Sequence, residues 1–247
     1  MRETKYECFP HKEFRPERAL QSGNGLANWN SLVRLSFVTL SLSHCSLTFS
    51  RSTAGAETTS TSLTWWALAM IAQPGIQRRA QAELDAVVGR ARPPTFSDAS
   101  SLPYIQAIVK ETLRWRPSLP LGIPHIMAED VWYEGVFIPK GTMCIANLWQ
   151  CHHDPESYGD DAAKFNPERF LDAESRILPG PAETRDEGHS TYGFGRRACV
   201  GKHVANDTLF ITIATVLWAA NLERVRDLNG KEVHLDTETV VDTGMTV

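Results

Sequence analysis

The sequence predicts a mainly α-helical fold with only small β-sheets. Apolar residues recur at the helical period over several long segments, whereas the strand-like segments are short and follow one another closely. A polar stretch over residues 152–195, rich in proline, glycine and acidic residues, is predicted to be an ordered meander without regular elements. A long stretch of this kind inside a compact domain is usually functional, so we expect it to help build a site.

Proline and glycine mark the ends of the predicted helices. Pro74 and Pro103 stand where a helix can begin, because the first helical turn does not use the N–H group that proline lacks. Gly89 and Pro117 stand where a helix ends. The predicted helices cover residues 54–72, 75–88, 104–115 and 204–222.

Short apolar segments after the third helix predict the small sheets. Gly135 separates two of these segments and supplies a hairpin turn, and Gly141 belongs to the next turn. The predicted strands cover residues 123–127, 131–133, 136–138 and 143–147, with weaker ones at 222–225 and 239–247.

Composition excludes several classes of protein. A net charge of −4 over 247 residues gives no reason to expect a nucleic-acid partner. The odd number of cysteines at irregular spacing argues against a disulfide framework and for a reducing compartment. The charged N-terminus lacks the apolar core of a signal peptide, and no stretch has the length and apolarity that a membrane span needs.

The chain changes character near residue 53. Residues 1–53 are polar and irregular, then rich in Ser, Thr and Leu with little helical periodicity, and we expect an atypical, poorly ordered segment of the kind that a gene-model artefact gives. Residues 54–247 have regular patterns and are predicted to form the functional part.

The most informative segment is the run at residues 192–201. It places Cys199 between Gly195 and Gly201, and Arg197 stands two residues before the sulfur. The positive end of the following helix favours a thiolate, glycine lets the backbone approach a flat ligand, and arginine pairs with a carboxylate. A haem offers an iron that needs an axial ligand and propionates that need cations. A buried structural cysteine is the other interpretation, and the flanking glycines and arginine disfavour it.

This run resembles the haem-binding loop of the cytochromes P-450, Phe-x-x-Gly-x-Arg-x-Cys-x-Gly. The chain matches that pattern at Gly195, Arg197, Cys199 and Gly201, and Tyr192 replaces the phenylalanine. The resemblance is to fungal microsomal members. It implies haem b with Cys199 as the axial iron ligand. It also implies a P-450 fold that is truncated to its C-terminal half.

Two further motifs occur in the order of that family. Glu111 and Arg114 lie one helical turn apart and can pair, and a Pro-Glu-Arg-Phe run at residues 167–170 contains Arg169. In isolation the first pair would be an ordinary surface contact. By the resemblance, the three charged residues form a buried structural triad that fixes the meander, and with it the cysteine loop, on the third helix.

The Ala-Gly-Ala-Glu-Thr-Thr run at residues 54–59 resembles the oxygen-binding stretch of the same family. A helical glycine such as Gly55 costs about 1 kcal/mol relative to alanine. The resemblance supplies a reason for it, a groove in which a diatomic ligand fits. Glu57 and Thr58 would then be the catalytic pair that relays protons. A helix start rich in Ser and Thr is the alternative.

Other polar residues near these motifs have predicted roles as well. By the resemblance, His125 contacts a haem propionate. The run at residues 151–154 is not predicted to bind a metal, because adjacent residues cannot all turn toward one ion. A basic face beside the cysteine would suit an acidic electron donor. Its residues are Arg196, Arg197, Lys202 and His203.

The resemblance implies a haem-thiolate monooxygenase that inserts one atom of O2 into a small apolar organic substrate, as in secondary metabolism. Its electron donor would be NADPH-cytochrome P-450 reductase. The alternatives are a haem-thiolate isomerase without O2 activation and a non-catalytic or unstable haem-binding fragment.

By the resemblance, family members lie on the endoplasmic reticulum membrane facing the cytosol. We expect this chain to lack their anchor, which leaves its attachment to the membrane open. With half of the fold absent, we expect the apolar residues Trp65, Trp66 and 209–218 to lack partners and the chain to be poorly soluble.

Overall fold

The computed structural model describes residues 46–181, 184, 186–227 and 229–232. All of them belong to the compact unit Cys45–Val247. The predicted strand at residues 239–247 and most of the segment 1–53 lie outside the described residues. None of the helices described here is long and apolar enough to cross a membrane.

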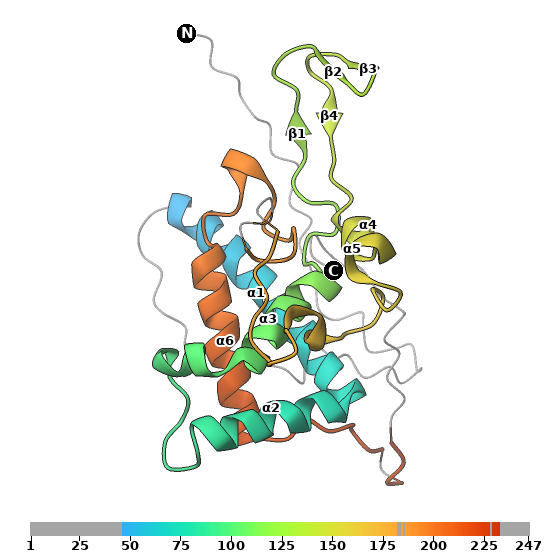
Figure 1. Ribbon diagram of the computed structural model, residues 1–247. Helices are drawn as coiled ribbons and strands as arrows, with labels where there is room; N and C mark the ends of the chain where they lie inside the picture. The colour runs from blue at the N-terminus through green and yellow to red at the C-terminus, as the bar shows by residue number, and fades with distance from the viewer. Residues whose placement is uncertain (1–45, 182–183, 185, 228, 233–247) are drawn as a thin grey trace. The chain divides into compact units, whose positions relative to one another are not determined.

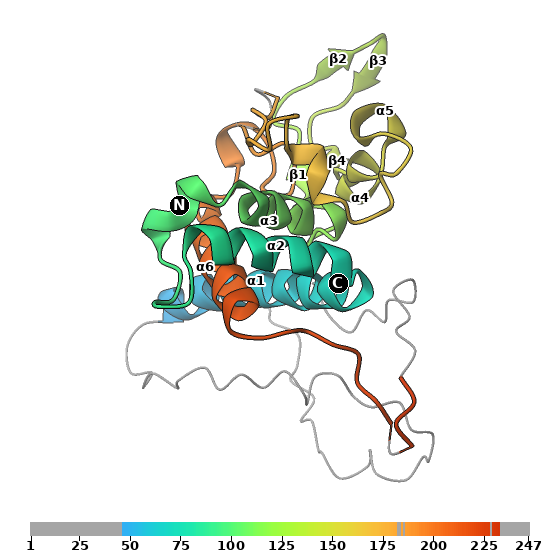
Figure 2. The ribbon, with the colours of Figure 1, turned by 60° about the horizontal axis from the view of Figure 1, so that its bottom comes forward.

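Long helices form the body of this unit, as the sequence predicts (Figure 1). Helix α6 packs against α1, α2 and α3, and these three also pack against one another. Figure 2 shows α6 crossing the other three helices. Their bounds are Ser46–Ala72 for α1, Pro74–Val87 for α2, Pro103–Trp115 for α3 and Lys202–Ala219 for α6.

The predicted start of α1 is wrong. The helix begins at Ser46, whereas helical periodicity of apolar residues starts only at residue 54. No proline or glycine interrupts residues 46–54, so the backbone continues the helix without an apolar face to mark it.

The core lies where the long helices meet, and this corrects a second expectation. Trp66 is 3% exposed, and the side chains of α6 that were expected to lack partners are among the most buried of the described residues. Trp65 and Trp218 are half-buried and pack against the same core. The helices present in this chain therefore supply the partners themselves. The most buried core side chains are Met70, Leu84, Ile105, Ile108, Ile213 and Leu217.

The strands form an arm that projects from the helices (Figure 1). Strand β1 (His125–Ile126) pairs antiparallel with β4 (Met143–Cys144), and both are shorter than predicted. Strands β2 (Val131–Tyr133) and β3 (Val136–Ile138) form a hairpin with the predicted bounds. Its turn residues, Glu134 and Gly135, have φ angles of 48° and 80°. Positive φ at both turn residues is what a two-residue hairpin of type I′ requires.

The predicted meander contains short helical turns that sequence periodicity did not reveal. Asp154 and Asn166 each accept a backbone N–H with the side chain and so start such a turn, and Asn147 does the same for a turn just before the meander. A few residues cannot display a helical period, which is why these turns were missed. Residues 222–225 form no strand, and an isolated bridge joins Arg226 to Glu232. The short elements are η3 (Phe96–Ser101), α4 (Leu148–His152), α5 (Pro155–Tyr158), η4 (Pro167–Phe170) and η6 (Gly195–Arg197).

The packing of α6 can be tested with one core substitution. Ile213 is 0% exposed, so Ile213→Ala is expected to lower the free energy of unfolding by about 2–5 kcal/mol, measured by urea denaturation. Val204 on the same helix is 71% exposed, and Val204→Ala serves as the control, with an expected change within about 0.5 kcal/mol. Equal losses in the two variants would contradict the packed core.

Candidate functional site

Hydrogen bonds between its own backbone groups hold the loop that carries Cys199. The N–H of Cys199 donates to the carbonyl of Tyr192 at 2.8 Å, and the N–H of Gly193 donates to the carbonyl of Ser190 at 2.9 Å. The thiol of Cys199 is free and exposed, between the end of η6 and the start of α6. The loop therefore presents the sulfur to the outside of the described residues instead of burying it.

The glycines of this loop leave open space around the sulfur. Gly195 has a φ of +55°, which other residues rarely adopt, and a Cβ built there would meet no atom within 4 Å. A Cβ on Gly201 would meet only the Sγ of Cys199, at 3.8 Å. The described residues do not crowd a Cβ at either position, which leaves room there for a flat group to approach the sulfur.

Of the remaining residues predicted at the haem, Tyr192 and Arg197 lie in the Cys199 loop, and His125 lies on another element. Tyr192 is half-buried, and its hydroxyl donates to the Oδ1 of Asn206 on α6 at 2.6 Å. Arg197 lies exposed in η6, and His125 lies exposed in β1. No hydrogen bond or ion pair among the described residues joins His125 to the Cys199 loop, and its contact with a haem propionate stays a prediction.

Glu57 and Thr58 lie on α1, with Glu57 exposed and Thr58 half-buried. The hydroxyl of Thr58 is 3.4 Å from the carbonyl of Gly55. The carbonyl of Thr58 accepts hydrogen bonds from the hydroxyls of Ser62 and Ser118 at 3.1 and 3.3 Å. A Cβ on Gly55 would meet none of the described residues within 4 Å, so these residues leave this side of α1 open.

The charged triad is buried and fully connected. Glu111 and Arg114 are 0% exposed, and Nε and one terminal nitrogen of Arg114 donate to the Glu111 carboxylate at 2.6 and 2.7 Å. Nε of Arg169 donates to the same carboxylate at 3.2 Å, with 9% of the Arg169 side chain exposed. The backbone N–H of Asn166 adds a fourth donor group at 2.7 Å. The carboxylate therefore ties α3 to the segment around η4.

The Arg114 side chain also binds backbone carbonyl groups of the meander, which the sequence did not predict. Its guanidinium donates to the carbonyls of His152, Ala162 and Lys164 at 2.6, 2.8 and 3.1 Å. A guanidinium has five N–H donors, and pairing with one carboxylate leaves several of them for carbonyl groups. Arg114 thus fixes backbone positions far from it in the sequence.

His152 is a further functional residue that sequence reasoning did not place. It is fully buried, and its Nε2 accepts the backbone N–H of Ser190 at 2.9 Å, just before the Cys199 loop. Burial, followed by the nearby Arg114 cation, lowers the pKa of His152 from 6.5 to about 4. Burial also lowers the pKa of neighbouring His189 well below 6.5. Both rings are therefore neutral at pH 7.

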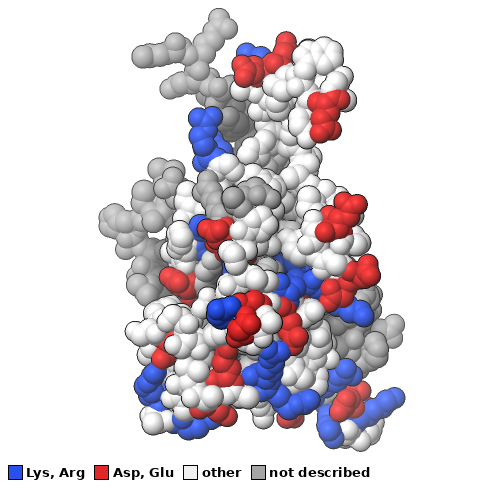
Figure 3. All heavy atoms as spheres, in the orientation of Figure 1, with Lys and Arg blue, Asp and Glu red and all other residues white. Residues whose placement is uncertain are grey.

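The predicted basic face is smaller than expected. Lys202 is not part of it, because its side chain is 14% exposed and lies 3.1 Å from the carboxylate of Glu187. Arg196, Arg197 and His203 are exposed. On the face drawn in Figure 3, basic and acidic side chains are interspersed.

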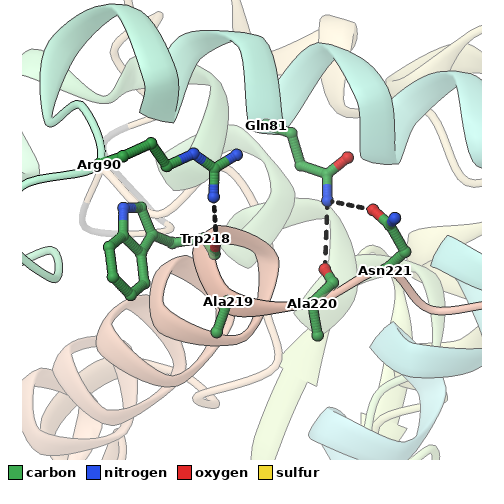
Figure 4. A pocket seen from close by; sticks show the side chains of 6 residues that line it. All are labelled: Gln81, Arg90, Trp218, Ala219, Ala220 and Asn221. Carbon is green, nitrogen blue, oxygen red and sulfur yellow. Dashed lines mark hydrogen bonds between the residues drawn. The ribbon is translucent and has the colours of Figure 1, made fainter.

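A shallow polar pocket lies at the C-terminal end of α6 (Figure 4). Gln81 donates to the carbonyl of Ala220 at 3.1 Å and to the Oδ1 of Asn221 at 2.8 Å, and Arg90 donates to the carbonyl of Trp218. The last carbonyls of a helix lack partners within the helix. The polar groups of this pocket satisfy them and hold α2 to α6.

Comparisons with known proteins give one consistent answer. The family model described as cytochrome P-450 matches residues 40–231. A cytochrome P-450 monooxygenase of Armillaria gallica is 58% identical over 192 residues, which are 78% of this chain and 37% of that protein. A second one from the same fungus is 52% identical over 79% of this chain and 38% of its own length. Cytochrome P-450 monooxygenase 58 of Postia placenta is 52% identical over 78% of this chain and 36% of its own length. The chain thus spans little more than a third of these relatives.

The triad is expected to be essential to stability. Glu111→Ala would leave the guanidinium of Arg114 buried without an anion and would leave Arg169 only its pair with Asp161, and breaking a buried pair in this way costs about 3–5 kcal/mol of unfolding free energy. Glu174→Ala is the control, because that carboxylate is 65% exposed in its pair with Arg176. Urea denaturation of both variants measures the difference. A loss below about 1 kcal/mol for Glu111→Ala would mean that the triad contributes no more than a surface pair.

Because His152 and His189 are buried, we expect the free energy of unfolding to fall as the pH falls. As the pH drops below about 6.5, the unfolded imidazole of His152 takes up a proton, whereas the folded one does so only near pH 4. Between these values the folded state loses roughly 1.4 kcal/mol per pH unit for this residue, because the unfolded state binds more protons.

The measurement is a series of urea midpoints between pH 7 and 4. His152→Gln keeps an acceptor for Ser190 but does not titrate, so its stability is expected to depend less steeply on pH. Some slope remains because His189 titrates in the same direction. His203 is exposed, and His203→Gln is expected to leave the slope unchanged. An identical slope for wild type and His152→Gln would contradict the assignment.

Proposed function

Because the chain belongs to the cytochrome P-450 family, we propose that it supplies the haem-binding part of a haem-thiolate monooxygenase. The reaction is insertion of one oxygen atom from O2 into a small apolar organic substrate. One observation carries the proposal. The thiol of Cys199 is free and exposed in a loop whose backbone fixes it and whose glycines leave room beside it.

The residues at this loop fit a haem. Thiolate is a soft ligand that suits iron, and no side chain of the described residues stands over Gly195. The exposed guanidinium of Arg197 is a suitable partner for a propionate, and His125 is the second candidate. A bound haem b supplies an iron centre at which O2 is activated, with electron density from the thiolate favouring cleavage of the O–O bond.

The chain's own residues then have distinct roles. Cys199 would hold the iron through its thiolate, and the triad of Glu111, Arg114 and Arg169 keeps the Cys199 loop in place through the meander. Thr58 moves a proton with its hydroxyl group, and the exposed carboxylate of Glu57 takes protons up from solvent. The open side of α1 at Gly55 leaves room for this exchange.

Electrons come from NADPH-cytochrome P-450 reductase, which we propose docks on the exposed Arg196, Arg197 and His203. The acid and alcohol pair on α1 favours O2 activation over isomerisation, because an isomerase has no need for proton delivery to bound oxygen.

The ligand assignment is tested by replacing the cysteine. In the haem-reconstituted chain, Cys199→Ala is expected to abolish the red-shifted band of the reduced CO complex, since a thiolate ligand produces that band. Cys151 is also free and exposed, so Cys151→Ala is the matched control and keeps the band. Retention of the band in Cys199→Ala would exclude this cysteine as the iron ligand.

The proton role is tested by coupling efficiency with the reductase. Thr58→Ala is expected to keep NADPH consumption but to divert it to hydrogen peroxide, because the proton relay has lost its hydroxyl. Thr64 lies exposed on the same helix, and its hydroxyl donates to the carbonyl of Ser60 at 3.0 Å, so Thr64→Ala controls for helix effects. Unchanged product formed per NADPH in Thr58→Ala would count against the relay.

A further inference from the structure

A second buried carboxylate lies beside the Cys199 loop. The Glu187 side chain is 11% exposed, and Nζ of Lys202 lies 3.1 Å from its Oε1. The side-chain amide of Asn206 donates to both carboxylate oxygens at 3.3 and 3.1 Å. Nζ of Lys110 lies 4.0 Å from Oε2. Groups from α3 and α6 therefore converge on a residue of the meander.

Lys110 fixes the backbone at the same place. Its ammonium donates to the carbonyls of Asp186 and Glu187, both at 2.9 Å. Asp186 has a φ of 67°, an uncommon conformation for a residue other than glycine. Burial lowers the pKa of Lys110, and the Glu187 carboxylate opposes that shift. The carboxylate thus helps to keep this half-buried lysine charged and bonded.

The contacts of Glu187 reach both ends of the Cys199 loop. After the cysteine, Lys202 is the first residue of α6. Before it, the Tyr192 hydroxyl donates to Asn206, whose amide donates to Glu187. The Tyr192 carbonyl in turn accepts the N–H of Cys199.

We propose that Glu187 is a positioning residue of the iron ligand, which holds both ends of the Cys199 loop against α3. This inference rests on the proposed role of Cys199.

The charge of Glu187 is the property that matters. One carboxylate faces two ammonium groups, those of Lys110 and Lys202. Without the carboxylate, two like charges would face each other in a half-buried place, and Lys202 would turn outward with the start of α6. The loop would then open more often, and uncompensated positive charge beside it would favour the reduced state of a bound haem.

The experiment compares Glu187→Gln with wild type by two readouts. In the chain without haem, hydrogen exchange of the Cys199 amide is expected to become about tenfold faster, because opening of the loop costs less. In the haem-reconstituted chain, the midpoint potential is expected to rise. Glu174→Gln is the control, because that carboxylate is 65% exposed and pairs with Arg176, and it should change neither readout.

A rescue variant separates charge from packing. Glutamine has nearly the shape of glutamate, so any effect of altered packing would be small in Glu187→Gln. Such an effect would also not change when a neighbouring lysine is replaced. Adding Lys202→Met to Glu187→Gln removes one of the two unpaired ammonium groups. It is expected to bring the midpoint potential back toward wild type, whereas exchange of the Cys199 amide stays fast because the contact between residues 187 and 202 is lost in both variants. Absence of rescue would overturn the charge argument.

Should Glu187→Gln fail to fold, Asn206→Ala tests the same connection without leaving a buried charge unpaired. It cuts the link from Tyr192 to Glu187, and several-fold faster exchange of the Cys199 amide is expected. Wild-type exchange in either variant overturns the proposal. A thiolate-type CO band that survives Cys199→Ala would instead overturn the ligand assignment, and the exchange data from the chain without haem distinguish the two failures.

Discussion

The Glu111 carboxylate is the interaction on which the rest of the structure depends. It is completely buried and is bonded by Arg114, by Arg169 and by the N–H of Asn166. Removing charges from water is costly, and the attraction between them repays that cost only where the geometry satisfies every group. Here the carboxylate has a full set of donors, and Arg114 uses its remaining N–H groups on backbone carbonyls.

This arrangement explains how the meander at residues 152–195, which has little regular structure, keeps one conformation. Its backbone cannot satisfy itself as a helix or a sheet does, so side chains must provide partners. Arg114 and the indole N–H of Trp115 donate to its carbonyls, the latter to Ala163 at 2.9 Å. Asp154 and Asn166 cap its short turns. The segment then leads to Ser190, whose N–H is accepted by His152, and so to the cysteine loop.

The sequence allowed local features to be predicted well. Helices α2 and α3 and the β2–β3 hairpin have nearly the predicted bounds, because proline and glycine mark their ends within a few residues. The start of α1 was missed since residues 46–53 carry no apolar period. The long-range features were harder to predict. Nothing in the sequence distinguishes the buried Glu187 or His152 from exposed residues of the same types, because their roles come from partners on α3 and α6.

Lys202 is a case in which the sequence predicts exposure and the structure shows a mostly buried side chain. Its position beside a cysteine and two arginines predicts an exposed cation, yet the carboxylate of Glu187 draws it inward. The two clusters differ in charge. Arg169 also pairs with the Asp161 carboxylate at 3.1 Å, so two carboxylates balance two guanidinium groups around Glu111. Glu187 instead faces two ammonium groups, those of Lys110 and Lys202. Both clusters contact the segment that ends in the cysteine loop. The irregular segment therefore takes its conformation from charged side chains of the long helices, which the local sequence around the cysteine does not reveal.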